Sequence, residues 1–183
     1  MDVNDVVAML KQDHESMNVD FVELVRSSNP DSDLFLDLAN RLVRHEVAEE
    51  IVVFPALREM QEGGQLADDR MTDQSEIEKQ LFHMERTGFE EAVIQQELCD
   101  LWSMVYDHWE REEGEVLPLL NVSVPLAKRI ELGRRYVEVR DTAPNRPHPH
   151  AGADPIANPI IGPMAALADW IRDCARRDLG QAS

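Results

Sequence analysis

A string of thirteen residues occurs twice in this chain and constrains its fold more than any other feature. Residues 45–57 read HEVAEEIVVFPAL and residues 108–120 read HWEREEGEVLPLL, so both contain H-x-x-x-E-E-x-x-V-x-P-x-L. A histidine and a glutamate four residues apart lie on one face of an α-helix, about 6 Å apart along its axis. One such string is ordinary surface decoration, but two copies in register predict two helices that carry matching functional faces.

The apolar residues of the first 120 positions follow the 3.6-residue helical period in four segments. These segments cover approximately residues 2–27, 33–60, 68–88 and 93–117, and no segment alternates as a strand would. Because the connections are short, consecutive helices should be antiparallel neighbours. The pattern predicts an all-α fold, an up-down-up-down four-helix bundle over residues 1–120.

The remaining residues, 121–183, are predicted to form a C-terminal extension. It begins with a loosely periodic helix over about residues 124–141. Six of the ten prolines follow within residues 144–163, which predicts an extended connector because proline lacks a backbone donor and restricts its predecessor. A short terminal helix after the connector has one apolar side and should pack back on the bundle.

Two histidine–glutamate pairs, His45 with Glu49 and His108 with Glu112, share their helix faces with leucine and valine residues. Both pairs should therefore point into the bundle. Burying imidazoles and carboxylates together is costly unless a cation pairs with them. One or two divalent metal ions are the natural partner, and imidazole with carboxylate suits iron, manganese or zinc. His14 lies on the apolar stripe of the first helix and is a further candidate ligand.

Each string also contains a proline, Pro55 or Pro118, which leaves a carbonyl of the preceding turn without its helical partner. Both helices should therefore bend beyond the site. The other glutamates of the strings are predicted to lie mostly on solvated helix faces: Glu46, Glu50, Glu113 and Glu115. Of these, Glu46 or Glu50 could contact a metal ligand from outside.

His14 and the two strings, H45-E-x-x-E49-E-x-x-x-F-P and H108-x-x-x-E112-E-x-x-x-L-P, resemble the hemerythrin-like HHE cation-binding domain over about residues 1–120. The resemblance implies a four-helix bundle with a non-haem di-iron centre, two Fe with an oxo or hydroxo bridge. His14, His45 and His108 would be terminal ligands, and Glu49 and Glu112 would bridge the irons. A single Fe or Zn ion is the alternative. The segment RPHPHAGADP resembles the C-terminal extension of actinobacterial members.

The third helix departs from the family pattern. Gln74 stands where the family usually has a histidine, and it could bind through its carbonyl oxygen, hydrogen-bond a metal-bound water or leave the place open. Glu78, one turn further on, is the alternative ligand. His83 lies on the opposite side of this helix and is predicted to be a surface residue. Phe54 stands where some relatives have tyrosine, so no phenol is available at that position.

Composition limits the partners of the chain. Asp and Glu number 36 against 18 Lys and Arg, a net charge of −18, so neither nucleic acid nor an anionic membrane is an expected partner. No apolar run is long enough to span a bilayer, and no signal peptide is visible. The two cysteines form no spacing motif, which is consistent with a reducing, cytoplasmic location.

Two classes of function fit these residues. The first is a redox-active di-iron protein that reacts with a small oxidant or diatomic molecule, H2O2, NO or O2, including a peroxide- or NO-detoxifying enzyme. The second is a non-catalytic iron or zinc binder for storage, sensing or folding. A structural or partner-binding bundle with vestigial metal residues is the third. Full oxygen carriers of the family use more histidines than the three aligned here, so reversible O2 carriage is not the expected role.

Overall fold

The computed structural model describes residues 4–87 and 93–143, and every regular element in these ranges is helical. The predicted connector and terminal helix fall in residues 144–183, outside the described residues. In chain order the elements are α1 (Val6–Arg26), α2 (Ser32–Ala48), the π-helical turn η1 (Glu49–Val53), α3 (Phe54–Arg58), α4 (Gly63–Thr87), α5 (Ile94–Arg111), the π-helical turn η2 (Glu112–Val116), α6 (Leu117–Ser123) and α7 (Leu126–Thr142).

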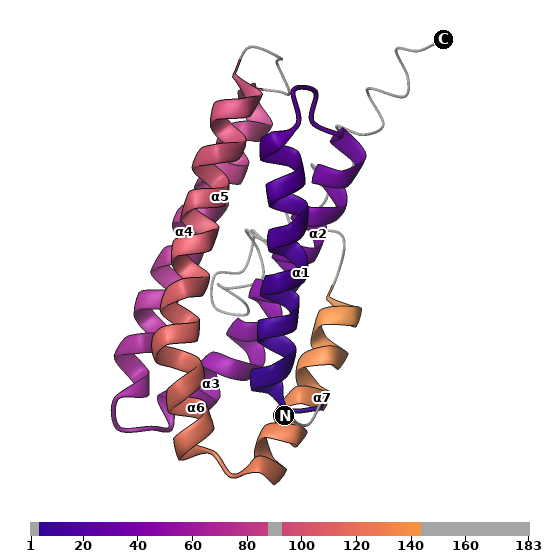
Figure 1. Ribbon diagram of the computed structural model, residues 1–183. Coiled ribbons are helices and arrows are strands. Elements are labelled where there is room, and N and C mark those ends of the chain that lie inside the picture. The colour runs from indigo at the N-terminus through magenta and orange to yellow at the C-terminus, as the bar shows by residue number, and fades with distance from the viewer. Residues whose placement is uncertain (1–3, 88–92, 144–183) are drawn as a thin grey trace, which may run out of the picture.

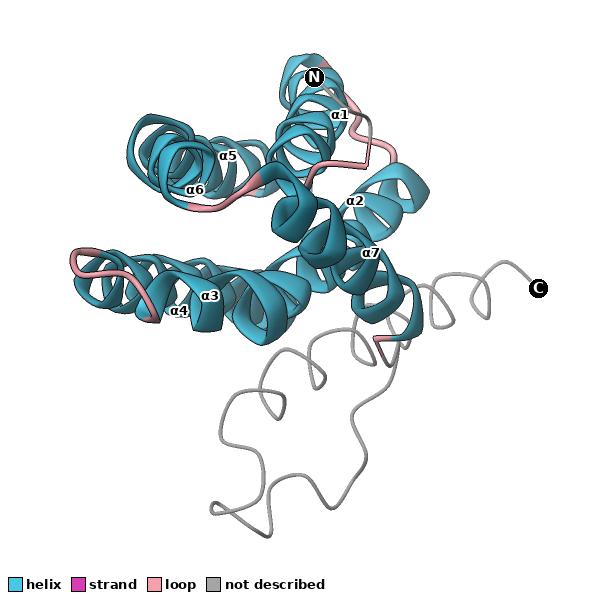
Figure 2. Cartoon of the chain, turned by 90° about the horizontal axis from the view of Figure 1, so that it is seen from below, coloured by secondary structure: helices cyan, strands magenta, loops and turns pink. Residues whose placement is uncertain are grey.

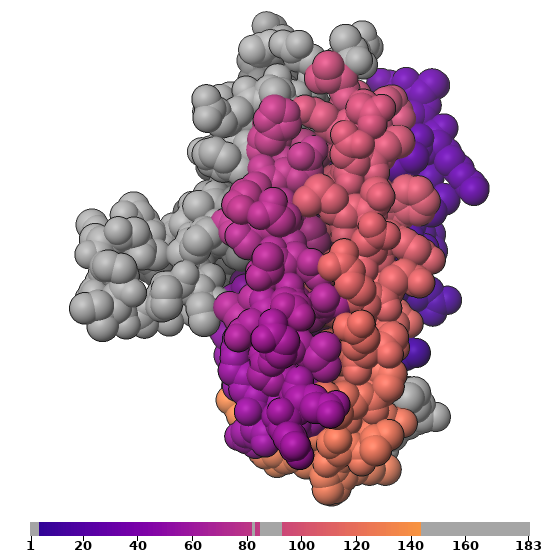
Figure 3. Space-filling view, turned by 90° about the vertical axis from the view of Figure 1, so that its left-hand side faces the viewer, coloured from indigo at the N-terminus to yellow at the C-terminus, as the bar shows by residue number. Residues whose placement is uncertain are grey.

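The long helices alternate in direction along the bundle. Figure 1 shows α1 leaving the N-terminal end, α2 returning to it, α4 leaving it again and α5 returning. The predicted up-down-up-down bundle is confirmed. The third helix begins at Gly63 rather than near residue 68. Seen from one side, α4 and α5 form a continuous face of the molecule (Figure 3). Of the helices that the structure describes, none is both long and apolar enough to cross a membrane.

The apolar core is divided into two clusters, and the buried histidines lie between them. On α1, His14 separates Leu10 of one cluster from Met17 of the other. On α2, His45 likewise follows Leu42 of one cluster and precedes Ala48 of the other. The bundle therefore has apolar layers on both sides of a polar layer, which excludes water from that layer.

The two proline strings leave the α-helix at the same point. Each contains a five-residue π-helical turn that begins at its glutamate, Glu49 or Glu112, and ends two residues before its proline, Pro55 or Pro118. Proline cannot donate to the carbonyl of the turn before it and its ring crowds that carbonyl, so a wider turn relieves both problems. A departure from the regular helix was expected beyond the site, but it begins at the glutamates themselves.

Helix α7 packs along α1 and α2 and encloses that side of the bundle (Figure 2). Leu132 and Tyr136 bury their side chains there, at 4% and 0% exposure. Arg129 pairs with the buried Asp5 at 2.9 Å, near the start of α1. At Gly133 the two backbones come close, since a Cβ there would lie 2.3 Å from the carbonyl oxygen of Asn4. The boundary at residue 120 stays a prediction, but the helix that follows it covers the core.

The close approach of the two backbones at Gly133 predicts that a larger residue there destabilises the fold. Gly133→Ala should lower the free energy of unfolding by about 1–3 kcal/mol, because the added methyl must displace the backbone of Asn4. Gly64→Ala is the matched control, since a Cβ at Gly64 meets nothing within 4 Å. Urea denaturation of both variants measures the difference. Equal stability of the two variants would show that α7 does not dock on α1 as described.

Candidate metal centre

The five residues singled out by the repeated string and the apolar stripe meet in the polar layer of the bundle. They come from α1, α2, η1, α5 and η2, and none is more than 2% exposed. They are His14, His45, Glu49, His108 and Glu112. The predicted convergence is therefore present in the structure, and the side chains offer nitrogen and oxygen atoms to one water-excluded space.

A first group of possible ligand atoms comes from His14, His45, Glu49 and Glu112, all within 4.8 Å of one another. His14 Nε2 lies 3.4 Å from Glu112 Oε2, and His45 Nε2 lies 3.5 Å from Glu49 Oε1. Two ligands bound to one ion at about 2.1 Å each are separated by about 3.0–4.2 Å. These two separations therefore fit ligands of one shared cation.

A second group comes from Glu46, Glu49 and His108, again within 4.8 Å. His108 Nε2 lies 3.7 Å from Glu46 Oε2 and 3.4 Å from Glu112 Oε1. Glu49 belongs to both groups. The prediction that Glu46 is mostly solvated is wrong, since it is 0% exposed. Because α1 and α7 cover the His45 side of α2, the neighbouring position 46 faces the interior towards His108.

Each of the three histidines turns Nε2 inwards and Nδ1 outwards to an oxygen atom. The outer contacts are His45 Nδ1 to Tyr136 Oη at 2.7 Å, His14 Nδ1 to Glu113 Oε1 at 3.0 Å and His108 Nδ1 to Asp73 Oδ2 at 3.6 Å. For His14 and His45 the outer hydrogen-bond acceptor favours the ring proton on Nδ1, which leaves the Nε2 lone pair facing the centre. The longer His108 contact is an ion pair in the same direction. This arrangement is typical of histidines that bind metals.

The inner atoms fit a cation better than they fit one another. His14 Nε2 and His45 Nε2 face each other at 3.1 Å. When both ring protons are on Nδ1, two lone pairs face each other at that distance and repel, and a positive ion between or beside them removes the repulsion. Within the described part of the chain, both carboxylate oxygens of Glu46 and of Glu112 are buried without a hydrogen-bond partner. Buried carboxylates without donors are costly, so the donor set matches iron, manganese or zinc.

Tyr136 was missed by the sequence analysis because it arrives from α7, far along the chain. Its hydroxyl accepts from His45 Nδ1 and donates to Asp13 Oδ2 at 2.7 Å, and Arg140 pairs with the same carboxylate at 3.0 Å. A phenol is therefore present beside the centre although position 54 is phenylalanine. The sequence analysis did not single out Asp13 either, although it directly precedes the candidate ligand His14.

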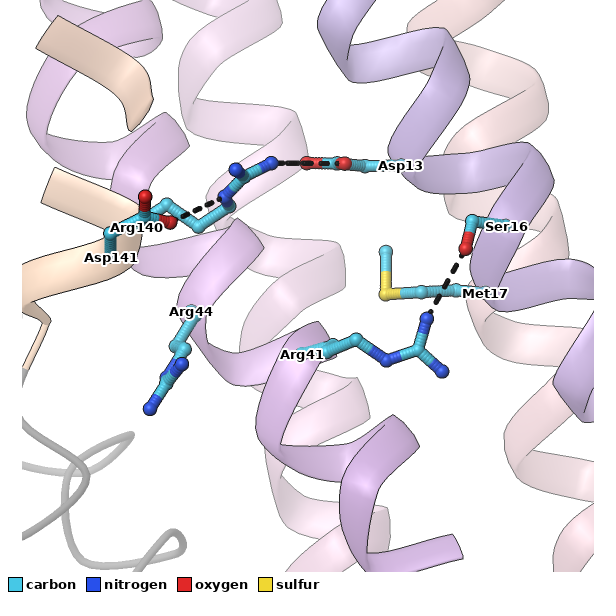
Figure 4. A pocket seen from close by; sticks show the side chains of 7 residues that line it. All are labelled: Asp13, Ser16, Met17, Arg41, Arg44, Arg140 and Asp141. Atoms are coloured by element: carbon cyan, nitrogen blue, oxygen red, sulfur yellow. Dashed lines mark hydrogen bonds and ion pairs between the residues drawn. The ribbon is translucent and has the colours of Figure 1, made fainter. Parts of the chain in front are cut away.

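A pocket of about 330 Å³ opens on the outer side of Asp13, where α1, α2 and α7 meet. It is lined by Asp13, Ser16, Met17, Arg41, Arg44, Arg140 and Asp141. Figure 4 shows Arg140 reaching across to Asp13 and Arg41 reaching towards Ser16. None of these residues belongs to the two ligand groups. The pocket therefore lies outside the centre, behind the residues that hold His45.

The third-helix candidates differ in position. Gln74 is 2% exposed, and its amide nitrogen donates to Glu49 Oε2 at 3.1 Å, so it contacts a predicted bridging residue. Glu78 is in neither ligand group. Burial and the charge of Glu78 raise the pKa of Glu50 to about 8. The His83 side chain is 60% exposed and lies 3.4 Å from Glu97. Ligation by Gln74 or Glu78 stays a prediction.

Burial and mutual repulsion shift the titration of the centre. Burial raises the pKa of Glu46 to about 8, and burial with the charge of Glu112 raises the pKa of Glu49 well above its usual range. Burial would lower the pKa of His108, but the charges of Glu112 and Glu46 raise it to about 9. Burial holds the pKa of His45 below its ordinary value. A bound cation would replace these protons, so metal binding should release protons.

The helical bundle and its buried histidine–carboxylate cluster place this chain in the class of metal-binding helical bundles. The family described as the hemerythrin HHE cation binding domain matches residues 5–120, and the chain belongs to this family. An uncharacterised hemerythrin-like protein of Schizosaccharomyces pombe is 24% identical over 168 residues, which is 88% of this chain and 82% of that protein. No solved structure gives a significant match. The family match ends before α7, the helix that contributes Tyr136.

The contact between Tyr136 and His45 predicts a loss of metal affinity on removal of the hydroxyl. Tyr136→Phe should weaken metal binding by about 10–100-fold, because His45 loses the partner that orients its ring. Tyr106→Phe is the control, since Tyr106 is 41% exposed and belongs to neither ligand group. Competition with a chelator measures both affinities. Equal affinities in the two variants would contradict the role given to Tyr136.

The shifted groups predict how stability depends on pH once a chelator has removed metal. Glu50 and His108 have folded pKa values of about 8 and about 9, above their ordinary values of 4.5 and 6.5. The folded state then binds more protons than the unfolded state between about pH 7 and pH 9, so the free energy of unfolding falls as the pH rises through this window. The lowered pKa of His45 makes the free energy of unfolding rise with pH instead, but only below pH 6.5.

Urea denaturation in EDTA at the two ends of this window measures the fall. The Glu50→Gln variant should show a smaller fall, because one of the contributing groups no longer titrates. A fall of the same size in Glu50→Gln and in the original chain would contradict the assignment to Glu50.

Proposed function

We propose that the chain is a non-haem di-iron protein that reacts with a small oxidant or diatomic molecule, namely H2O2, NO or O2. One observation carries the proposal: three buried histidines turn their Nε2 atoms into one layer together with carboxylates whose oxygens have no other partner among the described residues. The two ligand groups share Glu49, which supports two ions joined by a carboxylate. Imidazole and carboxylate together suit iron.

A surface hollow supports access by small molecules. It has a volume of about 310 Å³ between α1 and α5, and His14 and Trp109 form part of its wall. The Trp109 ring stacks on His14, with ring centres 5.0 Å apart. Tyr106 and Glu113 also line the hollow. His14 thus lies both in the polar layer and in the wall of this hollow, which supports entry of a small molecule from that side.

The residues of the chain would have separate roles at this centre. His14, His45 and His108 would hold the ions, and Glu49 and Glu112 would bridge them. Bound iron would supply the electron-transfer chemistry that peroxide or NO requires. Tyr136 holds a proton at Oη between His45 and Asp13, which fixes the His45 ring. The apolar clusters on both sides of the layer exclude water.

The second candidate is a non-catalytic iron or zinc binder. Zinc binds the same donor types, and burial of the cluster makes metal binding a source of folding energy in either case. The C-terminal segment 144–183 is assigned to an actinobacterial-type extension on its sequence alone, and the cytoplasmic location likewise rests on the sequence.

The test is metal analysis of the protein as isolated, an optical spectrum, and rapid mixing with H2O2 or NO. We expect iron, an absorption band that arises from a bridged iron pair, and a reaction within the mixing experiment. We expect no stable oxygenated form when the reduced protein meets O2. A colourless protein that holds only zinc and does not react would favour the second candidate. A clean, reversible O2 difference spectrum would favour an oxygen carrier.

The Gln74→His variant tests which residue limits the reaction. Gln74 contacts Glu49 from the place where the family usually has histidine. An imidazole there should tighten metal binding and slow the reaction with H2O2 or NO, because it removes an exchangeable position. Gln80→His, further along α4, is the control. A Gln74→His protein that reacts as fast as the control variant would contradict this assignment.

A further inference from the structure

Tryptophan and tyrosine are scarce in this chain, and most of them lie together. The sequence contains three tryptophans and two tyrosines. Of those that fall within the described residues, Trp102, Tyr106 and Trp109 are spaced four and three residues apart on α5, so they share one face of that helix. Indole and phenol rings lose a single electron more readily than most other side chains. A row of oxidisable rings therefore runs along the helix that also supplies His108.

Trp109 is the inner end of this aromatic row. It is 3% exposed, and its ring stacks on that of His14, with ring centres 5.0 Å apart and ring planes inclined by 13°. His14 Nε2 faces the polar layer, 3.4 Å from Glu112 Oε2. Stacked parallel rings overlap their π orbitals, so an electron can pass from one ring to the other. Trp109 is therefore in electronic contact with one of the candidate metal ligands.

Tyr106 and Trp102 form the outer end of the row. Their ring centres lie 6.0 Å apart, and Tyr106 is 41% exposed. Tyr106 and Trp109 both line the hollow between α1 and α5. Trp102 is held in place by its Nε1, which donates to Asn18 Oδ1 at 2.9 Å. Because electron tunnelling weakens exponentially with distance, short steps between rings are faster than one long step. The row thus connects a buried imidazole with the solvent.

We propose that Trp109 and Tyr106, extended by Trp102, carry single electrons from a donor at the protein surface to the metal centre at His14. The inference deepens the proposed di-iron function and rests on it. A donor that loses one electron to the row reduces one Fe(III) ion to Fe(II) at the far end. Two such electrons, with two protons from solvent, convert one H2O2 molecule into two water molecules.

The protons of the rings are accounted for within the row. Trp109 Nε1 has no hydrogen-bond acceptor among residues 4–87 and 93–143, so the indole keeps its proton while it passes an electron. The Tyr106 hydroxyl forms a hydrogen bond with the Glu110 side chain. Tyr106 passes its proton to that carboxylate when it loses an electron and takes the proton back when the next electron arrives. No net proton is consumed by the transfer itself.

The charges around Tyr106 select the kind of donor. Three carboxylates, those of Glu110, Glu113 and Asp107, act on its hydroxyl. Lys11 is the basic residue in the wall of the adjacent hollow, and it pairs with Glu113 at 3.5 Å. Negative charge around the exposed ring attracts a positively charged donor and repels a negative one. Hexaammineruthenium(II), a cation that gives up one electron, is therefore the probe for this route.

The first test measures the rate at which this probe reduces the oxidised, iron-loaded chain in the absence of oxygen, followed by the loss of the iron absorption band. Trp109→Phe and Tyr106→Phe keep a ring at each place but make it harder to oxidise. Both should be reduced at least about tenfold more slowly than the original chain. Their iron content, measured by metal analysis, should equal that of the original chain. Met104→Leu, on the opposite side of α5, is the control and should keep the original rate.

The second test maps where oxidation accumulates, by mass spectrometry of peptides after treatment of the iron-loaded chain with excess H2O2 and no donor. The rings must then supply the electrons. A ring that loses two electrons, takes up one water molecule and releases two protons gains one oxygen atom. That oxygen should be found on Tyr106 and Trp102 in the original chain. In Trp109→Phe it should move to residues beside the centre, such as His14 and Met17. The metal-free chain, treated alike, corrects for direct oxidation.

The outcomes separate this inference from the proposed function. Equal reduction rates in the original chain, Trp109→Phe and Tyr106→Phe would overturn the inference. Equal slowing in Met104→Leu would overturn it too, since any change to α5 would then have the same effect. The same oxidised residues with and without Trp109, or with and without iron, would also contradict it. An original chain that holds no iron would overturn the proposed function itself.

Discussion

Inward-facing imidazole nitrogens and unpartnered carboxylates, buried in one layer, are the constraint on which the rest of this structure depends. Without a cation and with both ring protons on Nδ1, His14 Nε2 and His45 Nε2 would repel at 3.1 Å, and a charge on Glu46 or Glu112 would have no hydrogen-bond donor within the described residues. The apolar clusters on both sides of the layer supply the favourable burial that allows such a layer to exist at all. The same clusters exclude water, which makes a cation at the centre worth more than it would be at the surface.

The two π-helical turns connect this polar layer to the apolar one below it. A wider turn rotates the following residues relative to a regular α-helix. Glu49 can therefore remain beside His45 while Val52 and Val53 join the adjacent apolar cluster. Proline after the turn fixes where the widening occurs, because its ring and missing donor exclude a regular turn there. In each string, therefore, the wider turn keeps the glutamate beside its histidine, and the proline fixes the position of that turn.

Sequence predicted the parts of this centre that depend on one helix at a time. His45 with Glu49 and His108 with Glu112 follow from spacing within a helix, and His14 from the stripe around it. Glu46 could not be predicted, because its burial depends on which neighbours enclose α2. Tyr136 could not be predicted either: its weakly periodic helix was assigned to an extension, and only its docking brings the hydroxyl to His45. Local periodicity indicates which face of a helix is buried, but not how many neighbouring positions the surrounding helices also bury.

Helix α7 therefore belongs to the centre energetically, although the family match ends before it. Its Tyr136 holds His45 through the hydroxyl, and Asp13 holds Tyr136 in turn, while Arg140 of the same helix pairs with Asp13. Any ion bound through His45 Nε2 favours the ring orientation that this chain of contacts requires. By linkage, an ion that binds more tightly when α7 is docked must stabilise the docking of α7 by the same free energy. The metal centre and the helix outside the repeated strings are therefore expected to fold as one cooperative unit.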